Sequence, residues 1–281
     1  KYDVNGDRYN TSPTIEQIFN STGPWKVNNN GVATTQERAV TQTGYADTLV
    51  GQVRKALIRK GLWDKAMVVF TADHGISFEG RPVPQRQADD KAMGDVANPP
   101  LFIKYPGQKK GKLETKHSMT IDIVPTIAET LGLNLNYEPD GVPLQGPVPD
   151  RPVEVEDIEG NVYSVTVDEM IRQREAGIAR TNKRLGTGPI YTLGPAPRLI
   201  GTPAPPAGAP AADAKASLDV PELYDDYQPD EDLIPMFITG STDALDEGTL
   251  LAVGVNGTIR GTARTFEFDG ADRFGTVVDP A

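Results

Sequence analysis

The segment from residue 35 to residue 72 constrains the fold more than any other part of the sequence. Within 35–60 apolar residues recur at helical spacing, with basic residues mostly on the other side, and Gly61 follows as a stop signal. Residues 66–72 then form a short apolar run rich in β-branched side chains, which is typical of a strand covered on both faces. An amphipathic helix followed by a doubly buried strand predicts a parallel α/β sheet.

A second strand and a second helix are expected to belong to the same layer. Residues 101–105 form another apolar run, which Pro106 and Gly107 close. Residues 123–131 place apolar side chains on one helical face, between Asp122 as a helix cap and Gly132 as a stop signal. We therefore expect an α/β fold with a mostly parallel sheet that contains 67–72 and 101–105 and is flanked by the two helices.

The pattern changes after about residue 150. Residues 162–167 predict a strand, and Asp168 marks the start of a polar helix that ends near Leu185. Residues 202–216 are rich in Ala, Pro and Gly and contain too little apolar surface to pack, so they predict a linker.

The end of the chain predicts a β-hairpin. Asn256 and Gly257 stand between two strand-like runs within 250–268, and Asn-Gly is the strongest short hairpin signal. We therefore expect an α/β portion in residues 1–150, followed by a smaller α+β or β-hairpin module in residues 151–281.

Composition excludes several classes of function. The chain has 28 basic and 39 acidic residues, a net charge of −11, and no basic cluster with interleaved aromatic residues, so we expect no nucleic-acid partner. Cysteine is absent, which excludes disulfides, thiolate zinc sites and thiol catalysis. No apolar run approaches the roughly 20 residues that cross a bilayer. Because the sequence starts at Lys1 without Met or a signal peptide, we expect a piece of a longer protein.

Asp73 and His74 are the residues best placed for chemistry. They directly follow the predicted strand at 66–72, where open α/β sheets bind their ligands, and Gly75 lets the backbone turn beside them. A carboxylate beside an imidazole suits a divalent ion such as Mn, Zn, Mg or Ca. The structural alternative is that Asp73 caps the next turn and His74 is a polar residue satisfied within the fold.

Five short segments, in this order, resemble the C-terminal half of sulfatases and of related alkaline-phosphatase-type transferases and phosphodiesterases. They are Tyr45-Ala46-Asp47, Leu62-Trp63-Asp64-Lys65-Ala66, Thr71-Ala72-Asp73-His74-Gly75, the run from Pro100 to Gly107, and the run from Ile121 to Ile127. Each is weak by itself, but the ordered set is specific. The likeness is strongest to sulfatase-like extracytoplasmic domains of bacterial membrane proteins, in which transmembrane helices precede the domain.

The resemblance implies roles for a few residues. Asp73 and His74 match the family's metal pair, so they would ligate a divalent cation that polarises a sulfate or phosphate ester. Lys104 is a second candidate that would face the substrate anion, and its alternative is a lysine that extends from an edge strand into solvent. His117 is a candidate substrate-binding or acid–base residue, although the family places its histidine closer to Asp122, where this chain has Thr120.

Two arginines and one aspartate near these positions have both a functional and a structural interpretation. Arg81 and Arg86 follow the metal pair, where a guanidinium can grip an oxyanion, but a solvated loop is the preferred interpretation. Asp122 precedes Ile-Val-Pro-Thr-Ile, which favours a helix cap over a catalytic carboxylate.

The resemblance starts midway through the family's domain. Sulfatases have an early Cys or Ser that becomes formylglycine, and the related transferases have a Thr or Ser nucleophile, but this chain has no cysteine and no equivalent early segment. We therefore expect a fragment that binds its metal weakly or not at all and is inactive alone. Its parent would act on a sulfate or phosphate ester, with a cell-envelope component as one candidate partner. The alternative is a non-catalytic extracytoplasmic binding module built on a degenerate hydrolase fold.

Overall fold

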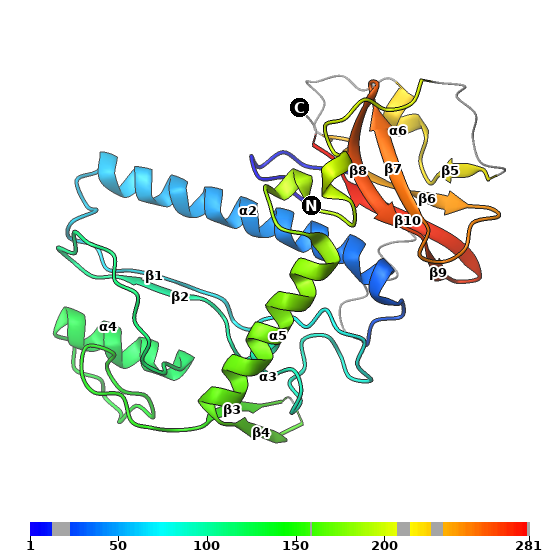
Figure 1. Cartoon of the computed structure of the whole chain (residues 1–281). Coiled ribbons are helices and arrows are strands. Elements are labelled where there is room, and N and C mark those ends of the chain that lie inside the picture. Colours follow the sequence, from blue (N-terminus) through cyan, green and yellow to red (C-terminus); the bar gives the residue numbers. More distant parts are fainter. Residues whose placement is uncertain (13–22, 158, 207–213, 226–232, 280–281) are drawn as a thin grey trace. The chain divides into compact units, whose positions relative to one another are not determined.

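The computed structural model describes residues 1–12, 23–157, 159–206, 214–225 and 233–279 (Figure 1). The chain divides into two compact units. Unit 1 comprises Lys1–Gly51, Phe78–Gln85 and Ile178–Ala281, and unit 2 comprises Gln52–Ser77 and Arg86–Gly177. Helix α2 (Asn29–Arg59) and helix α5 (Val167–Leu185) each continue from one unit into the other. The expected sequence division near residue 150 stays a prediction.

Unit 2 contains the two strands that were expected to form one sheet. Strand β1 (Val68–Thr71) pairs with β2 (Leu101–Lys104), which confirms that the two segments share a sheet. The pairing is antiparallel, with Val68 opposite Lys104 and Thr71 opposite Leu101, so the expected parallel sheet is wrong. Parallel neighbours need a long crossover, usually a helix, and the described connection from β1 to β2 contains only the four-residue helix α3 (Met93–Val96).

The burial of β1 also differs from expectation. Its first three residues are half-buried and Thr71 is exposed, and on β2 the Phe102 side chain is 64% exposed. The prediction of a strand covered on both faces is therefore wrong for the described residues. An apolar run indicates that a strand can be buried, but it does not show which of its faces the rest of the fold covers.

The core of unit 2 lies around α3. Met93 is fully buried there, together with Val96, Val153 and Met170. Val153 belongs to the antiparallel hairpin of β3 (Val153–Glu156) and β4 (Val162–Val165), and Met170 belongs to α5. The predicted strand at 162–167 and the polar helix that follows it are thereby confirmed within one or two residues.

Helix α4 (Ile123–Leu131) confirms the predicted second helix, and Gly132 ends it in the left-handed region at φ 65°. Asp122 lies at the expected N-cap position, but its side chain makes no capping bond to α4. The fully buried Asp122 carboxylate instead accepts hydrogen bonds from the backbone N–H groups of Met119, at 2.8 Å, and Val142, at 2.9 Å, and forms an ion pair with Arg151. These contacts close the loop after α4 onto its first turn.

In unit 1, the main sheet has four antiparallel strands in the order β5-β6-β10-β9. Their bounds are Ala216–Leu218, Phe237–Thr242, Ala271–Val277 and Phe266–Phe268, respectively. The core behind this sheet includes Tyr9, Val32, Phe237, Phe266 and Phe274. Short helical turns lie at Ile190–Thr192 (η2), Pro197–Leu199 (η3) and Glu222–Asp225 (α6).

The predicted hairpin is confirmed by β7 (Leu250–Val255) and β8 (Thr258–Arg264), which pair antiparallel. The turn residues Asn256 and Gly257 have φ values of 51° and 78°, which is the left-handed conformation that a tight hairpin turn requires. Of the expected linker at 202–216, residues 207–213 lie outside the described residues.

Helix α2 begins six residues before its predicted start, and most of its buried residues are polar. Near its beginning, the Thr34 hydroxyl donates to the Gly275 carbonyl of β10 at 2.9 Å. In contrast, Leu49, Val50 and Val53, which were expected to face a core, are 41%, 37% and 54% exposed. The amphipathic pattern predicted the helix correctly, but tertiary contacts at its first turns decide which residues are buried.

Glu37 is the buried carboxyl on α2. Its Oε2 accepts hydrogen bonds from the Thr276 hydroxyl, at 3.1 Å, and from the Val277 backbone N–H, at 3.0 Å. Burial outweighs both bonds and raises the pKa of Glu37 from 4.5 to about 8. Glu37 is therefore mostly protonated at neutral pH.

We expect the free energy of unfolding to fall as pH rises from about 4.5 to about 8, because across this range the folded state binds the Glu37 proton more tightly than the unfolded state. The slope should approach about 1.4 kcal/mol per pH unit. Glu37→Gln keeps an acceptor oxygen but cannot titrate, so it should remove this slope in urea titrations between pH 5 and pH 8. The matched control, Glu247→Gln at an exposed position, should keep the slope. Equal slopes in Glu37→Gln and the wild type would contradict a buried, proton-binding Glu37.

Asp122→Ala should destabilise unit 2 strongly, because Arg151 and two backbone N–H groups would lose their buried partner. Removing one member of a buried ion pair costs about 3–5 kcal/mol. Urea denaturation measures the loss. The control is Asp140→Ala, at an exposed position, which should change stability by roughly 0.5 kcal/mol or less.

Candidate functional site

The segment after β1 is held in place by helix α3. The Gly75 N–H donates to the Val96 carbonyl at 2.8 Å, and the Ser77 hydroxyl donates to the Asp95 carboxylate, also at 2.8 Å. Ser77 is fully buried. These contacts anchor the chain on the C-terminal side of Asp73 and His74, while β1 anchors it on the other side.

Gly75 has a steric role beyond the turn that was expected from the sequence. A Cβ atom built on Gly75 would lie 1.9 Å from the Asp95 carbonyl oxygen and 3.0 Å from its carbonyl carbon. Both atoms belong to the backbone, so they cannot rotate away. The close approach of this segment to α3 therefore requires glycine.

The His74 ring is oriented by its own neighbour. Its Nδ1 lies 2.8 Å from the Gly75 carbonyl oxygen. Because a carbonyl only accepts, the neutral ring carries its proton on Nδ1 and leaves the lone pair on Nε2. A backbone carbonyl on one ring nitrogen is the arrangement that orients metal-ligating histidines in proteins.

Asp73 and His74 present their free atoms side by side. The Asp73 Oδ2 lies 3.6 Å from the His74 Nε2, while the Asp73 Oδ1 accepts the His74 backbone N–H at 2.9 Å. Two ligand atoms on one tetrahedral Zn²⁺ with ordinary bond lengths lie about 3.4 Å apart. The pair therefore fits two positions of a divalent ion's coordination shell with little adjustment.

The side chains of Asp73 and His74 are open to solvent, and the Asp73 carboxyl is ionised. The side chains of Asp73 and His74 are 85% and 38% exposed. The pKa of Asp73 is lowered, first by the hydrogen bond from the His74 N–H and then by the charges of His74 and Arg86. The Asp73 carboxylate is therefore ionised at neutral pH. Across the described residues, no cluster of three or more His, Cys, Asp or Glu side chains that could hold a metal occurs.

Lys104 lies at the other end of the β1–β2 ribbon. Lys104 pairs with Val68 at the start of β1, whereas Asp73 and His74 follow the end of β1. The start and the end of β1 are about 10 Å apart. The Lys104 ammonium donates to the carbonyls of Trp63 and Ala66 and lies 5.0 Å from the centre of the Trp63 ring. The structure therefore does not bring Lys104 to the pair.

The other candidates have separate surroundings. His117 is half-buried, and its Nδ1 has no hydrogen-bond partner among the described residues. Arg81 donates to the carbonyls of Pro84 and Gln85 in its own loop. Arg86 is exposed, and its charge contributes to the lowered pKa of Asp73. The sequence did not single out Asp95, whose contact with Gly75 depends on tertiary packing.

Gly75→Ala should destabilise unit 2 and shift the position of His74, because the added methyl group would overlap the Asp95 carbonyl. Overpacking of this kind costs about 1–3 kcal/mol. Urea denaturation measures the loss, and the NMR shifts of the His74 ring report the displacement. Gly111→Ala is the matched control, since no atom lies within 4 Å of its added methyl group. If the two variants behaved alike, the steric role of Gly75 would be wrong.

Part of the chain is similar to known proteins. Residues 6–133 match the Sulfatase family. A protein named multifunctional alkaline phosphatase superfamily protein PehA, from Trinickia caryophylli, is 33% identical over 94 residues. The aligned residues cover 31% of this chain and 16% of that relative. No solved structure matches the chain. Both findings are similarities that cover part of the chain, and the family match includes Asp73 and His74.

Proposed function

We propose that this chain carries part of a metal-dependent ester hydrolase of the sulfatase family, and that Asp73 and His74 are two ligands of its divalent cation. The observation that carries the proposal is the 3.6 Å spacing between Asp73 Oδ2 and His74 Nε2, on a segment inside the matched residues 6–133. The family match supports a sulfate ester as substrate. Phosphate esters remain within the proposal, because the matched relative is named as an alkaline phosphatase superfamily protein.

The residues of this chain have distinct roles in the proposal. Asp73 binds the cation as a carboxylate, and His74 binds it through Nε2 while the Gly75 carbonyl holds the ring by Nδ1. Mn, Ca, Mg or Zn would neutralise charge that develops on the ester oxygens. Arg86 is a candidate for binding the substrate's anionic group, since its charge already acts on Asp73. A role for His117 as an acid–base or substrate-binding residue stays a prediction.

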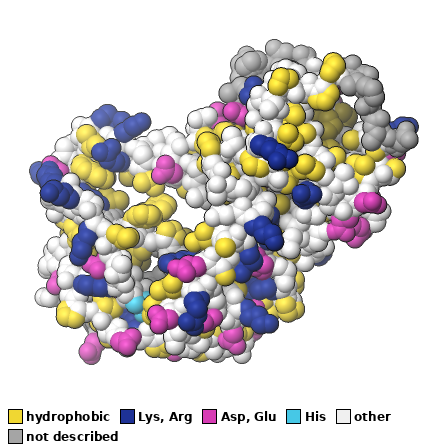
Figure 2. All heavy atoms as spheres, viewed as in Figure 1, with side chains coloured by type: hydrophobic (Ala, Val, Ile, Leu, Met, Phe, Trp, Pro, Cys, Tyr) yellow, Lys and Arg dark blue, Asp and Glu magenta, His cyan; other side chains and the backbone are white. Residues whose placement is uncertain are grey.

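We further propose that segments beyond these residues supply the nucleophile and the remaining ligands. Unit 2 exposes apolar side chains that a larger α/β domain would cover, with Phe102 at 64%, Leu131 at 52% and Leu133 at 56% exposure. Figure 2 shows hydrophobic side chains open to solvent between interspersed basic and acidic ones. The aligned part of the chain spans 16% of the matched relative, which leaves room for such segments.

The proposed setting is an extracytoplasmic domain of a bacterial membrane protein, with a cell-envelope component as one candidate substrate. This part of the proposal rests on the five sequence segments that resemble such domains. Among the described residues, no helix combines the length and apolar character needed to cross a membrane.

Mn²⁺ titration followed by NMR tests the metal pair. The chain has two histidines, so their ring resonances report two positions in one experiment. Mn²⁺ should broaden the His74 resonances before those of His117, with a dissociation constant of about 1 mM or weaker, because two protein ligands hold a cation poorly. Asp73→Asn should abolish the selectivity, and Asp140→Asn, at an exposed position, should leave it unchanged. Equal broadening of both histidines would contradict the proposed ligands.

Hydrolysis assays test the need for further segments. The 281-residue chain should not hydrolyse p-nitrophenyl sulfate, p-nitrophenyl phosphate or bis(p-nitrophenyl) phosphate in excess Mn, Mg, Zn or Ca, because under the proposal other segments supply the nucleophile and the remaining ligands. Metal-dependent turnover that His74→Ala abolishes would show a complete site in this chain. Selective Mn²⁺ binding without turnover, followed by turnover in a longer chain, would support the proposal over a non-catalytic binding module.

A further inference from the structure

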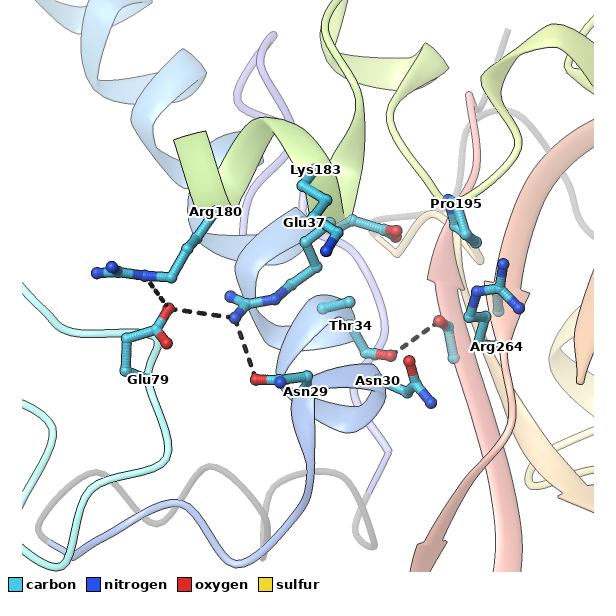
Figure 3. A pocket seen from close by; sticks show the side chains of 13 residues that line it. Asn29, Asn30, Thr34, Glu37, Glu79, Arg180, Lys183, Pro195 and Arg264 are labelled. Carbon is cyan, nitrogen blue, oxygen red and sulfur yellow. Dashed lines mark hydrogen bonds and ion pairs between the residues drawn. The ribbon is translucent and has the colours of Figure 1, made fainter. Parts of the chain in front are cut away.

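A pocket in unit 1 gathers cationic side chains from separate parts of the chain. Its volume is about 390 Å³, within the range of small-molecule sites. Figure 3 shows Arg180 and Lys183 of α5 on one side and Arg264, the last residue of β8, on the other. Asn29 and Asn30, from the start of α2, also line it.

The lining has a surplus of positive charge. Arg184 joins the three cations already named, and a single carboxylate, Glu79, pairs with Arg180 at 2.9 Å and with Arg184 at 3.4 Å. The other acidic residue in the lining is Glu37, which is mostly uncharged at neutral pH because burial raises its pKa to about 8. One shared carboxylate therefore faces four cations, and the pocket favours an anion.

Two of the four cations have no acidic partner among the described residues. The Lys183 side chain is exposed and forms no hydrogen bond or ion pair with the described residues. Arg264 donates from Nη1 to the neutral Gly248 carbonyl at 2.7 Å. The guanidinium charge is therefore not neutralised, and its remaining N–H groups can donate to a ligand. Arg184 is held in position by Gln36 at 2.8 Å and by Asn29 at 3.3 Å.

The pocket is a side-chain site, distinct from a simple helix terminus. The Asn28 side-chain oxygen already accepts the N–H groups of Asn30, at 2.9 Å, and Gly31, at 3.2 Å, at the start of α2. Those backbone donors are therefore used within the protein. The Asn29 and Asn30 amides supply polar groups that suit hydroxyls, while Ala33 and Pro195 add apolar surface.

We propose that this pocket binds a small polar molecule that carries a phosphate or sulfate group, the size of a monosaccharide ester. Arginine and lysine side chains bind the tetrahedral oxyanion that these two groups share. The proposal does not depend on the Asp73–His74 pair, because all residues that line the pocket belong to unit 1.

Calorimetric titrations of the whole chain in EDTA test the pocket. Glucose 6-phosphate and glucose 6-sulfate are the anionic probes, and glucose is the neutral control. We expect saturable binding of at least one anionic probe, weaker binding at higher salt, and no binding of glucose. The probe that binds more tightly distinguishes phosphate from sulfate.

Matched variants assign the binding to the pocket. Lys183→Gln and Arg264→Gln should each weaken binding about tenfold, since each removes a charge-assisted contact. Lys215→Gln, which removes an exposed charge outside the pocket, should leave affinity unchanged, as should His74→Ala. The proposal would be overturned if, in EDTA, neither anion bound saturably below about 10 mM. It would also be overturned if Lys215→Gln weakened binding as much as Lys183→Gln and Arg264→Gln do.

Discussion

The packing of the segment after β1 against helix α3 is the constraint on which the candidate metal pair depends. Gly75 lies so close to the Asp95 carbonyl that a side chain has no space, and the buried Ser77 ties the next turn to the Asp95 carboxylate. With the backbone held in this way, the Gly75 carbonyl fixes the His74 ring. The candidate ligand atoms of His74 and Asp73 are thus pre-oriented although their side chains are exposed, which would reduce the entropy lost if the pair binds the proposed cation.

Two buried carboxyl groups illustrate different solutions to the cost of removing charge from water. Glu37 has only neutral donors, the Thr276 hydroxyl and the Val277 N–H, so burial favours its protonated form. Asp122 faces a guanidinium from Arg151 as well as two backbone N–H groups. Glu37 therefore makes the stability of unit 1 depend on pH. Asp122 holds the loop after α4 in place through a buried ion pair.

The two proposed ligand sites differ in the chemistry they favour. Asp73 and His74 offer a carboxylate and an imidazole lone pair to a cation, whereas the pocket of unit 1 offers guanidinium and ammonium groups to an anion. The metal pair is incomplete within the described residues, because no third carboxylate, imidazole or thiolate joins it, while the pocket's cations are all present in this chain.

Local features were determined by the sequence by itself. Helix α4 ends at Gly132, the hairpin turns at Asn256-Gly257, and Asp73-His74 follows a short strand, because backbone preference and apolar spacing act over a few residues. Only the tertiary structure decided that β1 and β2 run antiparallel, that the Asp122 side chain at the N-cap of α4 binds Arg151 and makes no capping bond, and that Arg264 meets cations of α5 around one pocket. The physical reason is that strand direction, burial and charge clustering arise from contacts between residues far apart in the chain, which local periodicity does not record.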